Sequence, residues 1–397
     1  MDNWIERADK VLFQTYARFP LTFVRGEGAR LWDDRGCCFL DLVGGLAVCN
    51  VGHCHPKVVK AIEEQARRLV HVSNFYYHPP MVELAERLVE LSFAQKVFFC
   101  NSGAEANEAA IKLARKVAKD RGMPERFEII TMEGSFHGRT LATLSATGQK
   151  KYHKGFEPLV DGFKYVPFGE LEALEKAISP RTCAVMVEPI QGEGGVRVPP
   201  KGYLKGVMEL CERHGILLIL DEIQTGMGRT GTLFAHQAEG MVPHVMTLAK
   251  GIAGGLPMGA VLATEDVAKS LTPGTHASTF GGNPVAAAAG LAVLSVLVDD
   301  GLLESMRPVA QSLEQGLRRL AQRHQDLVVE VRGRGLMMAM ELREPCRPLV
   351  EACMAKGVLV NCTVDRVVRL VPPLVLTLED VEEALEVLQV AMVEVFG

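Results

Sequence analysis

Three apolar runs, each followed by a charged residue, most constrain how this chain can fold. They are CAVMV before Glu188, ILLIL before Asp221 and HVMTLA before Lys250. Runs so continuously apolar predict β-strands that are buried on both faces of a sheet. Helical patterns alternate with them, as at residues 104–118 and 203–215. This alternation predicts an α/β fold with a mostly parallel central sheet covered by helices.

The length of the chain predicts more than one domain. It has 397 residues, of which 48% are hydrophobic, and this is too long for one ordinary core. We expect a large α/β domain over residues 50–295. The two chain ends, residues 1–49 and 296–397, contain short strand patterns and helical patterns, and we expect them to form a smaller α+β domain together.

Charge and hydropathy favour a small-molecule partner. The net charge is −5, and Lys and Arg are scattered without blocks, so no basic surface for nucleic acid or anionic membrane is expected. The first twenty residues lack the apolar run of a signal peptide, and no later run reaches the ~18 apolar residues of a spanning helix. We therefore predict a cytoplasmic protein.

The ten cysteines predict reduced thiols. Their spacing is irregular and without a CxxC pair, so we expect buried thiols and no disulfide. Cys49, His53, Cys54 and His55 are the one cluster that raises the question of a metal. Because Pro56 then opens an amphipathic helical pattern, we interpret this run as the entry to a helix and predict no metal site.

The charges that follow the three apolar runs are candidates for a common site. Ligands of open α/β sheets bind beyond the carboxyl ends of the strands, where Glu188, Asp221 and Lys250 would meet. The alternative is that these strands simply end in polar residues. Three such residues followed by glycine-rich loops favour a site.

The chemistry of these groups suggests pyridoxal 5′-phosphate (PLP). Burial would lower the pKa of Lys250 towards a neutral nucleophile, which can bind this cofactor as a Schiff base. Asp221 after an apolar strand implies a cationic partner, and a protonated pyridine nitrogen would suit it. The cofactor also requires a phosphate site and a flat group over its ring.

The sequence offers a candidate for the phosphate site and one for the flat group over the ring. Residues 101–104 form a turn that opens a helix, where the backbone N–H groups and the Ser102 hydroxyl could hold a phosphate. The alternative is that Ser102 is an ordinary helix N-cap. Phe136 in SFHGRT is the candidate for stacking on the ring, although a Phe beside Gly can equally belong to the core.

With these residues in view, the chain resembles the fold-type I, class III (ornithine-type, subgroup II) PLP-dependent aminotransferases, and within them the members that act on acetylornithine. The resemblance runs nearly from end to end. It is carried by FVRGEGARLWD, GHCHP, FCNSGAEANEAAIKLAR, SFHGRT, VEPIQGEGG, ILDEIQTGMGRTG, LAKGIAGGLPMGA, STFGGNP and RLVPPL.

The resemblance implies a role for each residue around the cofactor. Lys250 would be the Schiff-base lysine and Asp221 the partner of the pyridine nitrogen. The other implied cofactor-binding residues are Glu188, Gln224 at the 3′-oxygen, Ile223 and Phe136 on the ring faces, Ser102, Gly103 and Ala104 at the phosphate, and Ser278 and Thr279 of the partner subunit. The resemblance thus also implies a homodimer with shared active sites.

The resemblance also implies how substrates are recognised. Arg369 would bind the α-carboxylate of 2-oxoglutarate and glutamate, Glu193 would neutralise Arg369 while the amine donor is bound, and Arg139 would bind the distal carboxylate. Taken singly, each would look like a surface salt-bridge residue. Tyr16 and Leu46 are the other expected substrate-binding residues. Leu46 stands where ornithine δ-aminotransferases have a tyrosine for the free α-amino group, which favours a donor with an acylated α-nitrogen.

The expected reaction is transfer of the δ-amino group of N2-acetylornithine to 2-oxoglutarate, in arginine biosynthesis. Alternative donors are N-succinyl-diaminopimelate, N2-succinylornithine, ornithine and 4-aminobutyrate. A PLP aminomutase or racemase on the same scaffold is a further alternative, disfavoured by the paired arginines and Glu193. A nucleotide-dependent enzyme or binding module is disfavoured because the sequence has neither GxxxxGK[ST] nor a GxGxxG that opens a helix.

Overall fold

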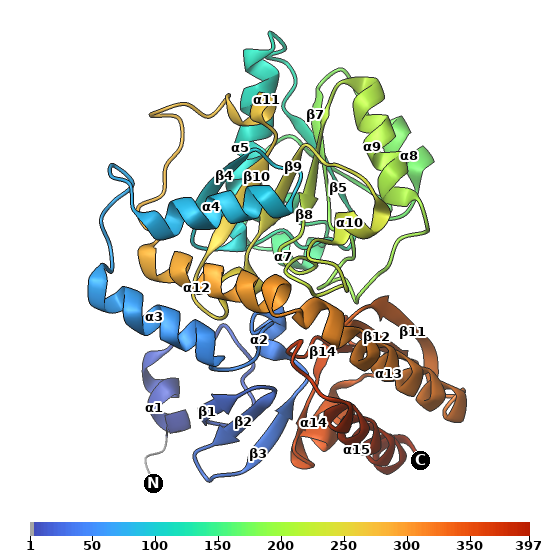
Figure 1. Ribbon diagram of the computed structural model, residues 1–397. Helices are drawn as coiled ribbons and strands as arrows, with labels where there is room; N and C mark the ends of the chain where they lie inside the picture. Colours follow the sequence, from blue (N-terminus) through green and yellow to red (C-terminus); the bar gives the residue numbers. More distant parts are fainter. Residues whose placement is uncertain (1–3) are drawn as a thin grey trace.

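A seven-stranded sheet forms the centre of the molecule (Figure 1). The computed structural model describes residues 4–397, so residues 1–3 of the predicted N-terminal part lie outside it. The strands, in sheet order, are β4 (Lys96–Cys100), β10 (Gly259–Ala263), β9 (Val245–Leu248), β8 (Leu217–Asp221), β7 (Thr182–Val187), β5 (Glu128–Met132) and β6 (Phe163–Val166). Within this sheet β10 runs antiparallel to both of its neighbours, and the other pairs are parallel. The predicted mostly parallel sheet is confirmed.

Helices cover both faces of this sheet, which explains why its strands are continuously apolar. Ala184 and Met186 of β7 belong to the same buried cluster as the alanine-rich helix α5 (Gly103–Asp120). Val185 and Val187, which point to the other face, pack with residues of α9 (Tyr203–His214). Alternate residues of one strand are therefore buried by different helices.

A further group of helices lies beside the sheet, and one of them packs against β4. It consists of α3 (Pro56–Arg68), α4 (Pro79–Leu91) and α12 (Pro284–Leu294), and α12 packs against the other two (Figure 1). Each of the three begins with a proline, which costs no hydrogen bond in the first turn. The His55 ring accepts a hydrogen bond from Lys57 N at 3.3 Å, so the GHCHP run is the helix entry that the sequence predicted.

The two chain ends form two smaller sheets beside the large one (Figure 1). The first is β1 (Phe23–Glu27), β2 (Arg30–Asp33), β3 (Cys38–Asp41) and β13 (Val358–Leu359), and the second is β11 (Val328–Arg334), β12 (Met337–Leu342), β15 (Val367–Leu370) and β14 (Asn361–Thr363). Since β13 pairs with β3, a C-terminal strand completes the N-terminal sheet. The predicted domain boundaries at 49/50 and 295/296 stay a prediction.

The remaining helices connect these layers. Those of the C-terminal part are η2 (Ser295–Asp299), α13 (Leu302–Arg323), α14 (Arg347–Ala355) and α15 (Leu378–Phe396). The others are α1 (Trp4–Val11), α2 (Gly44–Ala47), α6 (Leu141–Ala146), α7 (Lys150–His153), α8 (Leu171–Ala177), α10 (Ala235–Glu239), η1 (Lys250–Ala253) and α11 (Glu265–Ala268). Over residues 4–397 no single helix is long and apolar enough to cross a membrane, and the one pair that would suffice together, Pro284–Asp299 with Leu302–Arg323, is bent by 69°.

The prediction that every cysteine is reduced is wrong for one pair. Cys346 and Cys362 form a disulfide, with their Cα atoms 5.8 Å apart. Cys346 caps α14 and Cys362 lies in the middle of β14, so only the packing of these two elements brings the sulfur atoms together. The other eight cysteines are free thiols. The prediction that they are buried holds for four of them and is wrong for Cys37, Cys38 and Cys54, which are exposed, and for Cys49, which is partly exposed.

Arg229 joins both chain ends to the loop that follows β8. Its side chain is fully buried, and Nη1 donates to Leu336 O at 3.0 Å and to Pro372 O at 2.5 Å. Nη2 donates to Asn50 Oδ1 at 2.6 Å. All these acceptors are neutral, and burial lowers the pKa of Arg229 to about 9. This guanidinium therefore holds three distant segments through directed hydrogen bonds.

Replacing Arg229 is expected to destabilise the whole protein. Arg229→Ala leaves Asn50 Oδ1 and two buried carbonyls without their donor, so the free energy of unfolding should fall by about 3 kcal/mol or more. Urea denaturation followed by circular dichroism measures this. The control Arg318→Ala removes a salt bridge from a side chain that is 55% exposed and should change stability by roughly 0.5 kcal/mol or less. Equal midpoints for both variants would contradict this role of Arg229.

Candidate active site

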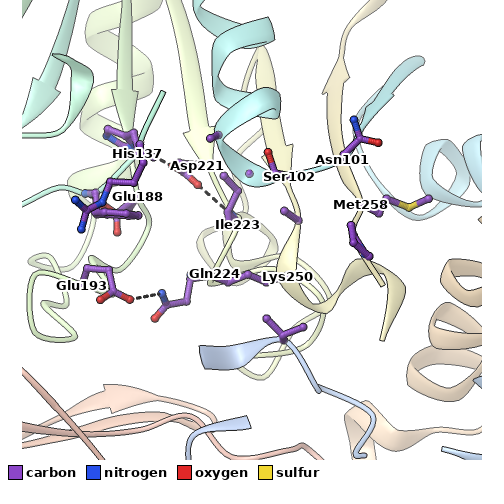
Figure 2. A pocket seen from close by; sticks show the side chains of 18 of the residues that line it. Asn101, Ser102, His137, Glu188, Glu193, Asp221, Ile223, Gln224, Lys250 and Met258 are labelled. Carbon is purple, nitrogen blue, oxygen red and sulfur yellow. Dashed lines mark hydrogen bonds and ion pairs between the residues drawn. The ribbon is translucent and has the colours of Figure 1, made fainter. Parts of the chain in front are cut away.

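A cavity of about 410 Å³ opens at the carboxyl ends of β7, β8 and β9 (Figure 2). These three strands are neighbours in the sheet, so Glu188, Asp221 and Lys250 meet at one place. The predicted site residues that line this cavity are Ser102, Gly103, Ala104, Phe136, Arg139, Glu188, Glu193, Asp221, Ile223, Gln224 and Lys250. This convergence disfavours the alternative that the three strands simply end in polar residues.

Lys250 lies at the start of η1, directly after β9. Burial lowers the pKa of its amine, although the nearby Glu193 acts in the opposite direction. The backbone of Lys250 has a φ of 45°, an unfavourable value for a residue with a side chain, so the surrounding structure must hold it. Gly251 cannot be larger, because a Cβ there would lie 2.5 Å from Asn50 Nδ2. The site thus presents an amine that is neutral more readily than an exposed lysine.

The carboxylate of Asp221 is buried and held by three donors. Oδ2 accepts from Asn107 Nδ2 at 2.8 Å. Oδ2 is also 2.7 Å from His137 Nδ1, and Oδ1 accepts from Ile223 N at 3.1 Å (Figure 2). Burial alone would lower the pKa of His137, but its bond to Asp221 outweighs this and the pKa is raised. The carboxylate is therefore fixed in one orientation.

Asn107 and His137 were not predicted from the sequence. Asn107 also binds Thr247 of β9, whose Oγ1 donates to Asn107 Oδ1 at 2.8 Å. One signal was present: Asn107 is a polar residue on the buried, alanine-rich face of α5. A polar side chain in such a position needs buried partners.

The N-terminus of α5 faces the same cavity. Ser102 caps this helix, because its Oγ accepts from Glu105 N at 3.2 Å, and it also lines the cavity. The N–H groups of Gly103 and Ala104 lie in the first turn, where a helix offers them no acceptor. A Cβ on Gly103 would lie 2.8 Å from Ile223 Cδ1, so glycine allows the helix to start this close to the loop after β8. The arrangement suits a phosphate.

Phe136 and Arg139 lie on the other side of the cavity. The Phe136 N–H donates to Glu188 Oε1 at 2.7 Å, and Gly192 N donates to Glu188 Oε2 at 2.9 Å. Burial raises the pKa of Glu188 to about 7. The Arg139 guanidinium lies 4.1 Å from the ring centroid of Tyr152, and among the described residues no carboxylate lies within salt-bridge distance of it. Arg139 is thus a free positive charge at the cavity.

Glu193 and Arg369 form an ion pair next to the cavity. Arg369 Nη1 donates to Glu193 Oε1 at 2.6 Å and to Gln224 Oε1 at 3.3 Å. Burial alone would raise the pKa of Glu193, but Arg369 lowers it. Figure 2 shows Glu193 beside Gln224, on the side of the cavity where Lys250 lies. The two charges neutralise each other in this arrangement.

Five predicted residues do not line this cavity: Arg369, which lies behind its partner Glu193, and Leu46, Tyr16, Ser278 and Thr279. Leu46 and Tyr16 are 45% and 71% exposed, respectively. Ser278 and Thr279 lie next to the phosphate turn but outside the cavity, and Asn101 Nδ2 donates to Ser278 Oγ at 3.3 Å. Val48, close to Leu46 in sequence, lines the cavity instead. The roles of these five residues, like those of the residues that line the cavity, stay predictions.

Removing Asn107 is expected to disturb the network around Asp221. Asn107→Ala takes a donor from Asp221 and an acceptor from Thr247, both buried, so the free energy of unfolding should fall by about 2 kcal/mol. Urea denaturation measures the change, with Gln325→Ala as an exposed amide control. If both variants unfold at the same urea concentration, the network does not contribute to stability.

Comparison with known proteins agrees with this geometry. The model of a family described as aminotransferase class-III matches residues 13–392. The chain is 50% identical over 382 residues to the acetylornithine aminotransferase of Myxococcus xanthus, which covers 96% of this chain and 95% of that protein.

Solved structures show the same fold. The chain superposes on the ornithine aminotransferase from Toxoplasma gondii with a TM-score of 0.96 and 35% identity, over 99% of this chain and 95% of that one. For the N-acetylornithine aminotransferase from Stenotrophomonas maltophilia the TM-score is 0.84 and the identity 40%, over 98% of each chain. With the family match over nearly its whole length, this chain belongs to the class III aminotransferases, PLP-dependent enzymes of fold type I.

Proposed function

We propose that the protein transfers the δ-amino group of N2-acetylornithine to 2-oxoglutarate, giving N-acetylglutamate 5-semialdehyde and glutamate, in arginine biosynthesis. The observation that carries this proposal is the Arg369–Glu193 pair beside a cavity that also holds Lys250 and the unpaired Arg139. The acetylornithine aminotransferases that share about half of its residues support the same donor.

The residues at the cavity fit PLP. When bound, this cofactor supplies an electron sink for the carbon that loses a proton. Lys250 Nζ would bind the cofactor covalently and, once free, would move a proton at the carbon that bears the amino group. Asp221 would keep the ring nitrogen protonated. The N–H groups of Gly103 and Ala104 and the Ser102 hydroxyl would hold the phosphate.

Further residues would hold the ring in place. Ile223 and Phe136 would lie on its two faces, and Gln224 would donate to the 3′-oxygen. Glu188 binds the backbone N–H of Phe136, so it would fix this ring face through the main chain.

The charges of the site match both substrates. N2-acetylornithine has one carboxylate, which the free Arg139 could bind while Glu193 neutralises Arg369. 2-Oxoglutarate has two carboxylates, so its second one could replace Glu193 on Arg369. In each complex every substrate carboxylate then has an arginine partner, which avoids an unpaired buried carboxylate on the substrate.

A panel of amine donors with 2-oxoglutarate as acceptor tests this function. N2-acetylornithine should give the highest kcat/KM, ahead of N2-succinylornithine, N-succinyl-diaminopimelate, ornithine and 4-aminobutyrate. Lys250→Ala is the negative control and should lose both turnover and the absorbance of the covalently bound cofactor. A clear preference for another donor would contradict the proposed substrate, and full activity of Lys250→Ala would contradict the role of the lysine.

We also propose that the enzyme is a homodimer in which Ser278 and Thr279 of the partner subunit complete the phosphate site. Exposed aromatic side chains support this surface: Phe75 is 91%, Tyr77 is 93% and Phe280 is 58% exposed. Asn74 donates to Ser278 O and Gly281 O at 2.9 Å, so these aromatics and the 278–281 segment lie together. An apolar patch of this kind marks a protein interface. The cytoplasmic location stays a prediction.

A charge within the aromatic patch should break the dimer. Tyr77→Asp is expected to shift the protein to the monomer, because a buried unpaired carboxylate is costly, and to lower turnover with it. Analytical ultracentrifugation at several concentrations measures the mass. Val242→Asp is the control, since Val242 is 57% exposed and far from this patch in sequence. An unchanged dimer in Tyr77→Asp would place the interface elsewhere.

A further inference from the structure

We propose that Asn361 is a positioning residue for recognition of the acceptor's carboxylate: it holds one end of the Arg369 guanidinium and leaves the other end free to exchange partners. This inference rests on the function proposed above. Strand β14, which carries Asn361, would hold the Arg369 guanidinium in place while Glu193 and the substrate carboxylate bind it in turn.

The sheet register puts Asn361 in place. In the antiparallel pair of β14 and β15, Asn361 lies directly opposite Arg369, so both side chains point to the same face. Asn361 Oδ1 accepts from Arg369 Nη2 at 2.8 Å. Arg369 is only 1% exposed, so this hydrogen bond is shielded from water. The Arg369 Nη2 end of the guanidinium is therefore fixed by the strand next to it.

The neutrality of Asn361 matters for this task. A carboxylate in its place would orient the guanidinium equally well but would also neutralise it permanently. An amide oxygen orients without adding charge. Nη1 contacts Glu193 and Gln224 in this structure. Because Asn361 adds no charge, the guanidinium stays positive and a substrate carboxylate can bind it at Nη1.

The backbone around Glu193 is also fixed, so only its side chain is left to move. Thr363, two residues along β14, donates from Oγ1 to Glu193 O at 2.9 Å. Arg332 donates from Nε and Nη2 to Gly195 O at 3.0 and 2.8 Å. Without these anchors the glycines of GEGG would leave the loop free. The partner exchange on Arg369 then requires rotation of one side chain rather than movement of the loop.

β14 itself is held firmly. Asn361 and Thr363 point to one side of the strand, whereas Cys362 points to the other and is bonded to Cys346 at the start of α14. The strand that carries Asn361 is thus joined by hydrogen bonds to β15 and by a covalent bond to α14.

Two variants separate orientation from charge. Asn361→Asp keeps the shape of the side chain and adds a negative charge beside Arg369. Asn361→Ala removes the acceptor and adds none. Gln325→Glu, which adds the same charge at an exposed position, is the matched control. Each holoenzyme is measured in two separate half-reactions by stopped-flow absorbance, with N2-acetylornithine and with 2-oxoglutarate. Calorimetry measures the binding of glutarate, a dicarboxylate that cannot react.

We expect acceptor binding to weaken more in Asn361→Asp than in Asn361→Ala, and the reaction with the donor to change little. Asn361→Asp should raise two quantities by about tenfold or more: the 2-oxoglutarate concentration that gives half the maximal rate of its half-reaction, and the Kd for glutarate. One charge-assisted contact is worth at least that factor. Asn361→Ala should raise both by about threefold. The donor half-reaction should change much less, because Arg369 is already neutralised there, and Gln325→Glu should behave as the unchanged protein.

Three outcomes would overturn the inference: equal losses in both half-reactions, a larger loss in Asn361→Ala than in Asn361→Asp, or no change in either variant. A failure of the proposed function can be told apart from a failure of this inference, because the unchanged enzyme itself would then not react with N2-acetylornithine or 2-oxoglutarate. Glutarate binding still decides the role of Asn361 in that case. If Asn361→Asp does not fold, a threefold loss confined to the acceptor side of Asn361→Ala supports the inference and its absence refutes it.

Discussion

The site depends above all on the burial of a carboxylate at the end of a parallel strand. Asp221 is 3% exposed, and a charge so placed costs several kcal/mol unless it is paired and hydrogen-bonded. The surrounding elements meet that cost together: α5 contributes Asn107, the loop after β5 contributes His137, and the main chain contributes the N–H of Ile223. The buried charge of Asp221 thus draws three separate elements to one point.

Two buried arginines connect the chain ends to this site, and their partners differ. Arg229 donates to main-chain and amide oxygens that all belong to fixed backbone or to Asn50. Arg369 combines a neutral partner, Asn361, with a charged and rotatable one, Glu193. The first set of contacts holds segments together permanently. The second set leaves one position open to exchange, as recognition of two different substrates requires.

Much of the fold and the centre of the site could be predicted from local sequence patterns. The apolar runs before Glu188, Asp221 and Lys250 are readable because burial on both faces requires every residue of a strand to be apolar. The partners of Asp221 were missed because they lie 114 and 84 residues away in sequence, and only the packing of α5 and the loop after β5 brings them near. The disulfide was missed for the same reason. The predicted roles of Ser278 and Thr279 in a partner subunit came from the resemblance to a family, and the structure of one chain does not test them.

The order of β7, β8 and β9 fixes the spacing of the groups that follow these strands. Neighbouring strands lie about 4.8 Å apart, so the groups that follow these three strands are spaced across roughly 10 Å by backbone hydrogen bonds alone. The helices and loops between the strands can lengthen or shorten without altering that spacing. The spacing of the Lys250 amine and the Asp221 carboxylate is therefore set by the sheet, whereas Arg139 and Arg369 are held by other parts of the chain, the segment between β5 and α6 and strand β15.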